Sequence, residues 1–167
     1  MRLVCITTQG TLDVQYAVSI TSPTPNIFYS IGGSPPFIKD YQTVNNTNEP
    51  YMDFLEFILK QPSIPQTMSV SYGDDEQTVP EDYARNVCNQ FARLGAMGVS
   101  VLVASGDVGV GNATCLTNDG TNSKIFIPDF PTSCGFSPFF LLQTLTIELY
   151  GVRSLRHKRR GYIRGEP

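Results

Sequence analysis

Histidine is nearly absent from this sequence of 167 residues, and charged residues are scarce. His157 is the only histidine, which excludes a His-based catalytic triad and a metal site with two histidines. Charged residues make up 16% of the chain and hydrophobic residues 41%, a composition typical of globular or secreted proteins rather than disordered ones. Long hydrophobic runs are also missing. Polar side chains interrupt the apolar patch at residues 136–150, so we predict no membrane span.

The first ten residues hold one charge and no apolar stretch, so no signal peptide is recognised. The chain has no internal repeats, and its length suits one domain with a real core. Its charge is unevenly distributed, with a net charge of −7 over residues 1–134 and +4 over residues 135–167. This split indicates two segments of different origin or role. The basic run at residues 156–160 is therefore interpreted as part of an unrelated tail rather than as a nucleic-acid patch.

The four cysteines match neither a zinc-site spacing nor a Cys-x-x-Cys motif. Cys115 and Cys134 bracket a polar loop, and we expect a disulfide between them. Cys88 lies on a helix face and is expected to be buried, unless it competes for one of those two partners. Two N-glycosylation sequons begin at Asn45 and Asn112, in polar surroundings where glycans are tolerated.

Strands are predicted at residues 26–31, 67–72 and 99–104, and amphipathic helices at residues 49–61 and from Thr78 to the glycines at 95 and 98. Alternating strands and helices indicate βαβ units, and so a parallel sheet with right-handed crossovers. The pattern suggests Asn48 as the cap of the first helix and a capping box from Thr78 to Glu81 for the second. The predicted apolar faces are Tyr51, Phe54, Leu55, Ile58 and Leu59, and Ala84, Val87, Cys88, Phe91 and Leu94.

Residues 98–111 contain a short apolar strand that ends in Ser-Gly-Asp, and Asp107 is the acidic residue of that motif. In open α/β sheets, ligands bind outside the carboxyl ends of the strands, so Asp107 is a candidate for chemistry. The glycines do not follow the dinucleotide order Gly-x-Gly-x-x-Gly, which argues against nucleotide binding. The acidic run at residues 74–76 admits a magnesium site, but we favour a solvated acidic turn.

Four stretches, in order, carry a resemblance to a known family. They are Leu-Asp-Val-Gln-Tyr-Ala at 12–17, Ser-Tyr-Gly-Asp-Asp-Glu at 71–76, the Ser-Gly-Asp-x-Gly-Val-Gly motif at 105–111, and Phe-Ile-Pro-Asp-Phe-Pro-Thr-Ser-Cys at 126–134. Together they resemble the sedolisins, the serine-carboxyl peptidases, and in particular the fungal tripeptidyl-peptidases. The resemblance covers residues 12–134 and stops at Cys134.

The resemblance implies a subtilisin-like fold and a Ser-Glu-Asp triad that works in acid. A carboxylate can act as general base at a pH where histidine stays protonated, and a protonated Asp can donate to an oxyanion. Asp107 matches the oxyanion Asp, and Asp13, on a helix over residues 12–20, matches the Asp that supports the base. Residues 71–73 (Ser71, Tyr72 and Gly73), called the wall segment below, match a strand that lines the substrate cleft.

Two catalytic positions of the family are not filled. Gln9 stands four residues before Asp13, where the family has its Glu, and a carboxamide has no titratable oxygen that could take the proton. The Gly-Thr-Ser-x-Ser motif of the nucleophile is absent from the sequence, as is the family's calcium site, so we predict no metal or other cofactor in this chain.

The resulting expectation is an α/β fold, a subtilisin-like parallel sheet flanked by helices that is incomplete. Residues 1–11 form a divergent segment, residues 12–134 a partial peptidase domain and residues 135–167 the basic tail. The function expected is that of a partial acid serine peptidase, inactive as this chain, from a secreted family that acts on peptides or proteins. The alternative is a non-catalytic module that binds peptides or a partner. Neither nucleic acid nor a membrane is expected as a partner.

Overall fold

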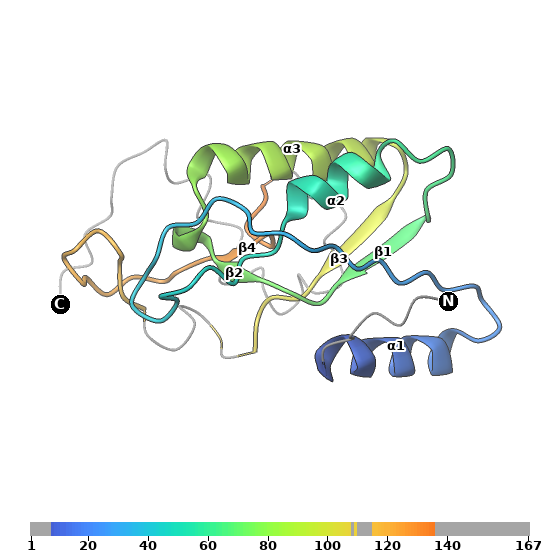
Figure 1. The fold of residues 1–167 in the computed structure, drawn as a ribbon, viewed down its shortest axis with the longest axis horizontal. Coiled ribbons are helices and arrows are strands. Elements are labelled where there is room, and N and C mark those ends of the chain that lie inside the picture. Colours follow the sequence, from blue (N-terminus) through green and yellow to red (C-terminus); the bar gives the residue numbers. More distant parts are fainter. Residues whose placement is uncertain (1–7, 108, 110–114, 136–167) are drawn as a thin grey trace. The chain divides into compact units, whose positions relative to one another are not determined.

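The computed structural model describes residues 8–107, 109 and 115–135 (Figure 1). The chain consists of two compact units, Met1–Gly32 and Gly33–Pro167. Four sequence features lie outside the described residues: the apolar patch at 136–150, the basic run at 156–160, the sequon at Asn112 and Cys5.

In its described residues, the first unit contains one helix, α1 (Thr8–Thr21), which confirms the helix that the resemblance implied. The strand predicted at residues 26–31 is not present: these residues have no regular structure, and Ile27 and Phe28 are exposed. The prediction was wrong because an apolar, β-rich run becomes a strand only when another strand pairs with it. The described residues of this unit supply no such strand.

The second unit is built on β1 (Thr67–Val70) and β3 (Ser100–Val103), which pair in parallel from Thr67↔Ser100 to Val70↔Val103. The backbone bond from Ala104 N to Val70 O extends the ladder beyond β3. Between the two strands runs the helix α3 (Glu81–Ala96), so the arrangement is the predicted βαβ unit. Helices with a small parallel sheet are consistent with the expected α/β class.

Two helices lie on the same side of this sheet, α3 and the shorter α2 (Tyr51–Ile58), as Figure 1 shows. Their apolar residues recur every three or four positions and therefore face the sheet and each other. The predicted apolar faces are largely confirmed. The buried members are Tyr51, Leu55, Ile58, Val87, Cys88, Phe91 and Leu94.

The predicted helix caps were wrong. Pro50 precedes α2 and Pro80 precedes α3, and neither helix has a side-chain cap. Asn48 and Thr78 are instead buried together, 30 residues apart in sequence. Thr78 Oγ1 donates to Asp75 O over 2.8 Å and lies 3.3 Å from Asn48 Oδ1, while Asn48 Nδ2 donates to Thr78 O over 3.3 Å. Buried polar groups must be hydrogen-bonded, and this mutual pairing satisfies both side chains at the base of the short 3-10 helix η1 (Glu76–Thr78).

A second, two-stranded ladder joins β2 (Asp74–Asp75) to β4 (Asp129–Phe130) in antiparallel fashion. Its register pairs Asp74 with Phe130 and Asp75 with Asp129. The expectation of a solvated acidic turn is therefore wrong, since Asp74 and Asp75 are buried. Pairing with β4 draws the acidic residues under a distant segment that the local sequence does not reveal.

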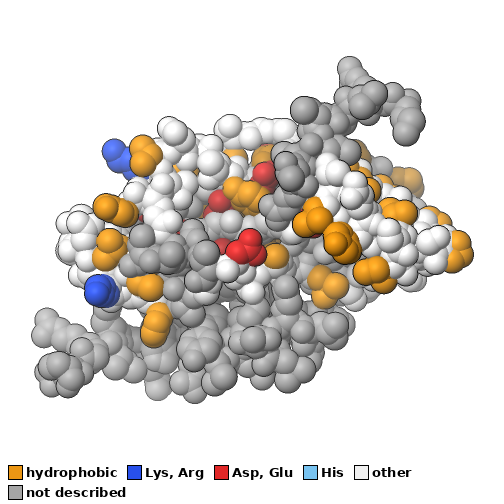
Figure 2. Space-filling model, turned by 90° about the horizontal axis from the view of Figure 1, so that it is seen from below, with side chains coloured by type: hydrophobic (Ala, Val, Ile, Leu, Met, Phe, Trp, Pro, Cys, Tyr) orange, Lys and Arg blue, Asp and Glu red, His pale blue; other side chains and the backbone are white. Residues whose placement is uncertain are grey.

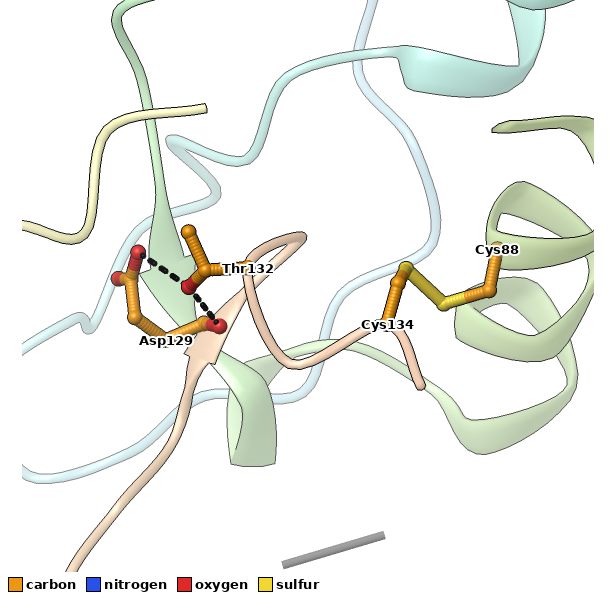
Figure 3. The surroundings of a disulfide bond; sticks show 4 residues. All are labelled: Cys88, Asp129, Thr132 and Cys134. Atoms are coloured by element: carbon orange, nitrogen blue, oxygen red, sulfur yellow. Dashed lines mark hydrogen bonds between the residues drawn. A yellow bond between two sulfur atoms is a disulfide. The ribbon is translucent and has the colours of Figure 1, made fainter. Parts of the chain in front are cut away.

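The disulfide joins Cys88 to Cys134 and not Cys115 to Cys134, so that expectation was also wrong (Figure 3). Cys88 lies on the buried face of α3, and the turn after β4 brings Cys134 to a Cα–Cα distance of 5.3 Å, within the normal range for a disulfide. Cys115 is half-buried and takes no part in this bond.

Within the part of the chain that the structure describes, no helix is long and apolar enough to cross a bilayer.

Candidate functional site

The candidate site lies where β1 and β3 end. Because parallel strands present their carboxyl ends at one edge of a sheet, the wall segment after β1 and residues 105–107 after β3 leave the sheet at the same edge. Asp107 lies there in an exposed bend, preceded by Gly106 with a φ of +77°. The structure thus has Asp107 and the wall segment at the same sheet edge; their catalytic and binding roles stay predictions.

Asp129 is a component of this edge that sequence reasoning missed. Its carboxyl group packs on the backbone of the wall segment: a Cβ added to Gly73 would lie 2.8 Å from Asp129 Cγ. A Cβ added to Gly106 would lie 3.9 Å from Asp129 Oδ1. One carboxyl group therefore spans the ends of both strands, and only glycine at position 73 leaves room for it.

Asp74, which follows the wall segment, is a second carboxyl group here; it is buried, whereas Asp129 is half-buried. Burial raises its pKa to about 6, with a further rise from the charge of Glu49. The nearby Tyr72 hydroxyl group and the backbone N–H of Glu49 favour the ionised form and partly offset this rise in pKa. Burial raises the pKa of Glu49 as well.

The pKa of Asp129 is raised to about 7, above all by burial and then by the charges of Asp74 and Asp75. The Thr132 hydroxyl opposes this rise: it donates to the backbone carbonyl of Asp129 and lies 3.3 Å from Oδ2 (Figure 3). Two carboxyl groups with pKa values near 6 and 7 exchange protons in the weakly acidic range, where ordinary aspartates are ionised.

Some buried carboxyl oxygens in this cluster lack a donor. Among the described residues, Asp74 Oδ2 and Glu76 Oε2 are buried without a hydrogen-bond partner. Glu76 does anchor the backbone, because its N–H donates to Pro128 O over 2.8 Å and so holds the segment before β4. In the view of Figure 2, acidic side chains are seen together near the middle of the face. Buried oxygens of this kind are costly when ionised, which agrees with the raised pKa values of their neighbours.

Two tyrosines fix the wall segment. The buried Tyr51 of α2 donates from its hydroxyl group to Tyr72 O over 2.9 Å, and its ring makes edge contacts with Phe91 and Phe130. The Tyr72 hydroxyl donates to Thr47 O over 2.6 Å. Burial raises the pKa of both phenols, that of Tyr72 to about 12, so both remain donors at physiological pH. The middle carbonyl of the wall segment is therefore held by a buried donor.

Gln77 connects the acidic segment to two loops. Its Nε2 donates to Asp40 Oδ2 and to Leu116 O, at 3.1 and 3.0 Å, and its Oε1 accepts from Asn118 N. The same polar loop closes on itself at the isolated bridge between Leu116 and Lys124. Sequence reasoning predicted a polar loop here but not the side chain that holds it.

Asp13, the other predicted catalytic residue, is half-buried on α1, one turn after position 9. It belongs to the first unit, whereas Asp107 belongs to the second, and the catalytic role of Asp13 stays a prediction. Within the described ranges, no group of three or more His, Cys, Asp and Glu side chains is arranged to hold a metal ion.

Comparison with known proteins identifies relatives by sequence but no matching solved structure. No family model and no solved structure matches the chain. It is 47% identical over 133 residues to tripeptidyl-peptidase sed4 of Aspergillus fumigatus, a match that covers 77% of this chain and 22% of that protein. It is 43% identical over 134 residues to tripeptidyl-peptidase SED2 of Arthroderma otae. It is also 39% identical over 168 residues to the probable tripeptidyl-peptidase SED3 of Arthroderma benhamiae, covering 92% of this chain.

The chain spans under a third of the length of these relatives, between 22 and 28%. Identities of this size over most of the chain confirm the family resemblance that the four sequence stretches indicated. The chain belongs to the sedolisin family as a partial match to its tripeptidyl-peptidases.

Proposed function

We propose that this chain is part of a secreted, acid-acting serine-carboxyl peptidase of subtilisin-like fold, and that it does not hydrolyse peptides by itself. The observation that carries the proposal is the sheet edge at which the wall segment and Asp107 follow two parallel strands. Those are the positions to which the family resemblance assigns a substrate-binding wall and an oxyanion-stabilising Asp. The names of the relatives support peptides as the substrate class.

Inactivity of the chain alone follows from the residues that are missing. The base position holds Gln9, and no Gly-Thr-Ser-x-Ser motif occurs in the 167 residues. Loss of a triad member costs roughly three to six orders of magnitude in kcat, and here both the base and the nucleophile are absent. The remaining residues, Asp13 and Asp107, orient and stabilise but cannot attack a carbonyl carbon. The calcium site of the family is likewise proposed to lie outside this chain.

The test is hydrolysis of a fluorogenic tripeptide substrate by the purified chain from about pH 3 to 7, a range that covers carboxyl titration. A serine-directed label is applied in parallel. We expect no turnover and no labelled serine. Turnover with a labelled serine would contradict the proposal, because it would reveal a nucleophile that the family pattern does not include.

A second candidate function is binding of peptides or a partner chain without catalysis. It is favoured by the fixed wall segment, whose central carbonyl is held by Tyr51 with no help from the catalytic positions. Peptide binding along an extended segment uses such pre-oriented backbone groups. Fluorescence anisotropy of labelled peptides would detect it.

The matched variants for this test are Gly73→Ala and Gly32→Ala. A side chain at position 73 collides with the Asp129 carboxyl group, whereas a Cβ at position 32 meets nothing within 4 Å. Binding that is weakened only by Gly73→Ala would support the module. Equal binding by both variants, or no binding by the original chain, would exclude this candidate.

A further inference from the structure

The β4 segment is held against the wall segment by a short backbone ladder, by the buried ring of Phe130 and by the contact of the Asp129 carboxyl group with Gly73. The β2–β4 ladder has two residue pairs, Asp74↔Phe130 and Asp75↔Asp129. Beside it, Glu76 N donates to Pro128 O, and the Asp129 carboxyl lies on Gly73. Beyond the ladder, the Cys88–Cys134 disulfide ties the chain to α3. Opening of the ladder would thus leave the segment tethered.

Among the described residues, the groups that face these carboxyls carry no compensating positive charge. Toward Asp74 lie Glu49 from the segment before α2 and Tyr72 from the wall segment. Toward Asp129 lie Asp74 and Asp75 from β2 and the neutral Thr132. Tyr51 of α2 adds a neutral phenol, whose pKa is raised by burial and then by the charges of Asp74, Glu49 and Asp129. The two ion pairs in the described part of the chain, Lys60–Glu56 and Arg85–Glu81, lie elsewhere on exposed helix surfaces.

Because these described neighbours supply no cation, a proton is the positive charge that can neutralise the two carboxyl groups. Asp74 is 91% buried, and its Oδ2 has no donor among the described residues. A protonated carboxyl group is neutral and is stable against the Gly73 backbone, whereas two ionised groups repel one another and lose hydration. Their raised pKa values agree with this geometry.

We propose that Asp74 and Asp129 form a proton-dependent latch: while they are protonated, β4 stays paired with β2 against the wall segment, and when both ionise that pairing opens. The β1–β3 ladder, which contains no ionisable residue, is unaffected. The disulfide limits the opening and allows the segment to return when the pH falls. This inference requires neither peptide binding nor hydrolysis, so it can fail or succeed independently of the proposed function.

The test is amide hydrogen exchange of the whole chain at about pH 4, 6 and 8, expressed as protection relative to intrinsic exchange at each pH. The amide of Glu76, bonded to Pro128 O, reports the latch, and the amide of Ala104, bonded to Val70 O, reports the β1–β3 ladder. We expect protection of Glu76 to fall about tenfold or more between pH 4 and 8, because the two carboxyl groups ionise over this range. Protection of Ala104 should not change.

Variants separate ionisation from other effects of pH. Asp74→Asn and Asp129→Asn keep the size of the side chain but cannot ionise, so each should preserve protection of Glu76 at pH 8, and the double variant most of all. Asp82→Asn is the matched control, because Asp82 is an exposed carboxylate in the first turn of α3. It should leave the pH dependence as it was.

Three results would overturn the latch. One is protection of Glu76 that does not depend on pH. Another is loss of protection at Glu76 and Ala104 together, which means global unfolding. The third is an unchanged pH dependence in the Asp129→Asn variant. If an Asn variant does not fold, the two amides of the original chain decide the question alone.

Discussion

The two strand ladders of the second unit, β1–β3 and β2–β4, differ in the side chains that surround them. Between β1 and β3, four residues pair in parallel, and the buried Val101 and Val103 face the apolar side of α3. Between β2 and β4, two residues pair, and buried carboxyl groups accompany them. The first ladder lies among apolar side chains, whose burial is insensitive to pH, whereas the second combines the buried ring of Phe130 with carboxyl groups that titrate. We therefore expect the stability of the β1–β3 ladder to be independent of pH and that of the β2–β4 ladder to depend on pH.

The largest effect on stability should come from a cavity on the buried face of α3. Leu94 of α3 is fully buried, so Leu94→Ala should lower the free energy of unfolding by about 2–5 kcal/mol. Denaturant unfolding at about pH 4 measures the change, and Met97→Ala, at an exposed position, is the control. If Leu94→Ala lowers the free energy of unfolding no more than Met97→Ala does, apolar packing of α3 does not stabilise this unit.

Removal of the covalent tether should have the next largest effect. The Cys88–Cys134 bond closes a loop with a sequence separation of 46 residues. The double variant Cys88→Ala/Cys134→Ala should lose about 2–4 kcal/mol of unfolding free energy. Cys115→Ala, which leaves this bond intact, serves for comparison. If Cys115→Ala costs as much as the double variant, the disulfide is not the dominant tether.

The pH dependence of stability should be smaller. Asp74 and Asp129 have folded-state pKa values raised to about 6 and 7, so the folded chain binds more protons than the unfolded chain above about pH 4. Their contribution is complete below the unfolded pKa and is lost as the pH rises through 6 to 7. The loss in unfolding free energy should be about 1–3 kcal/mol, since Asp129 is only half-buried and the two carboxyl groups titrate as a coupled pair, both of which reduce the full linkage value.

Denaturant midpoints at pH 4, 6 and 8 measure this loss. Asp129→Asn should flatten the profile, because an amide does not titrate. A profile that rises with pH in both proteins would contradict the sign derived from the raised pKa values.

The smallest effect should come from an exposed ion pair. Arg85 and Glu81 lie one turn apart on the solvent side of α3, with Nη2 and Oε1 2.6 Å apart. Both side chains are mostly exposed, and such pairs contribute little in water. Arg85→Gln should leave the denaturant midpoint within experimental error at every pH. A clear shift in the midpoint would mean that surface charges, and not only buried carboxyl groups, control the stability of this unit.

Sequence reasoning succeeded where the determining pattern is local. The spacing of Val87, Phe91 and Leu94 identifies the buried face of α3 because helix periodicity acts within a few residues. The same holds for α2 and for the strands on either side of α3. The position of Asp107 followed from a short strand that ends in glycine-flanked polar residues.

Sequence reasoning failed where a segment distant in the chain determines the environment of a residue. Asp74 is polar in a polar run, and only β4, more than 50 residues later, makes it buried. Asn48 and Thr78 each look like caps, yet they pair with one another. The cysteine pairing likewise depends on where the chain returns after β4, which no spacing rule reveals. The glycine at 73 was the one available signal for Asp129, since close approach of another group requires it.

The covalent loop between Cys88 and Cys134 contains β3, residues 105–107 and the exposed turn around Asp119. A single proteolytic cut in that turn would not separate the chain into two molecules. The cleaved protein would gain only the mass of one water and would migrate as one species until a reductant was added. Limited proteolysis followed by gels with and without reductant would therefore count the cuts inside this loop separately from those outside it.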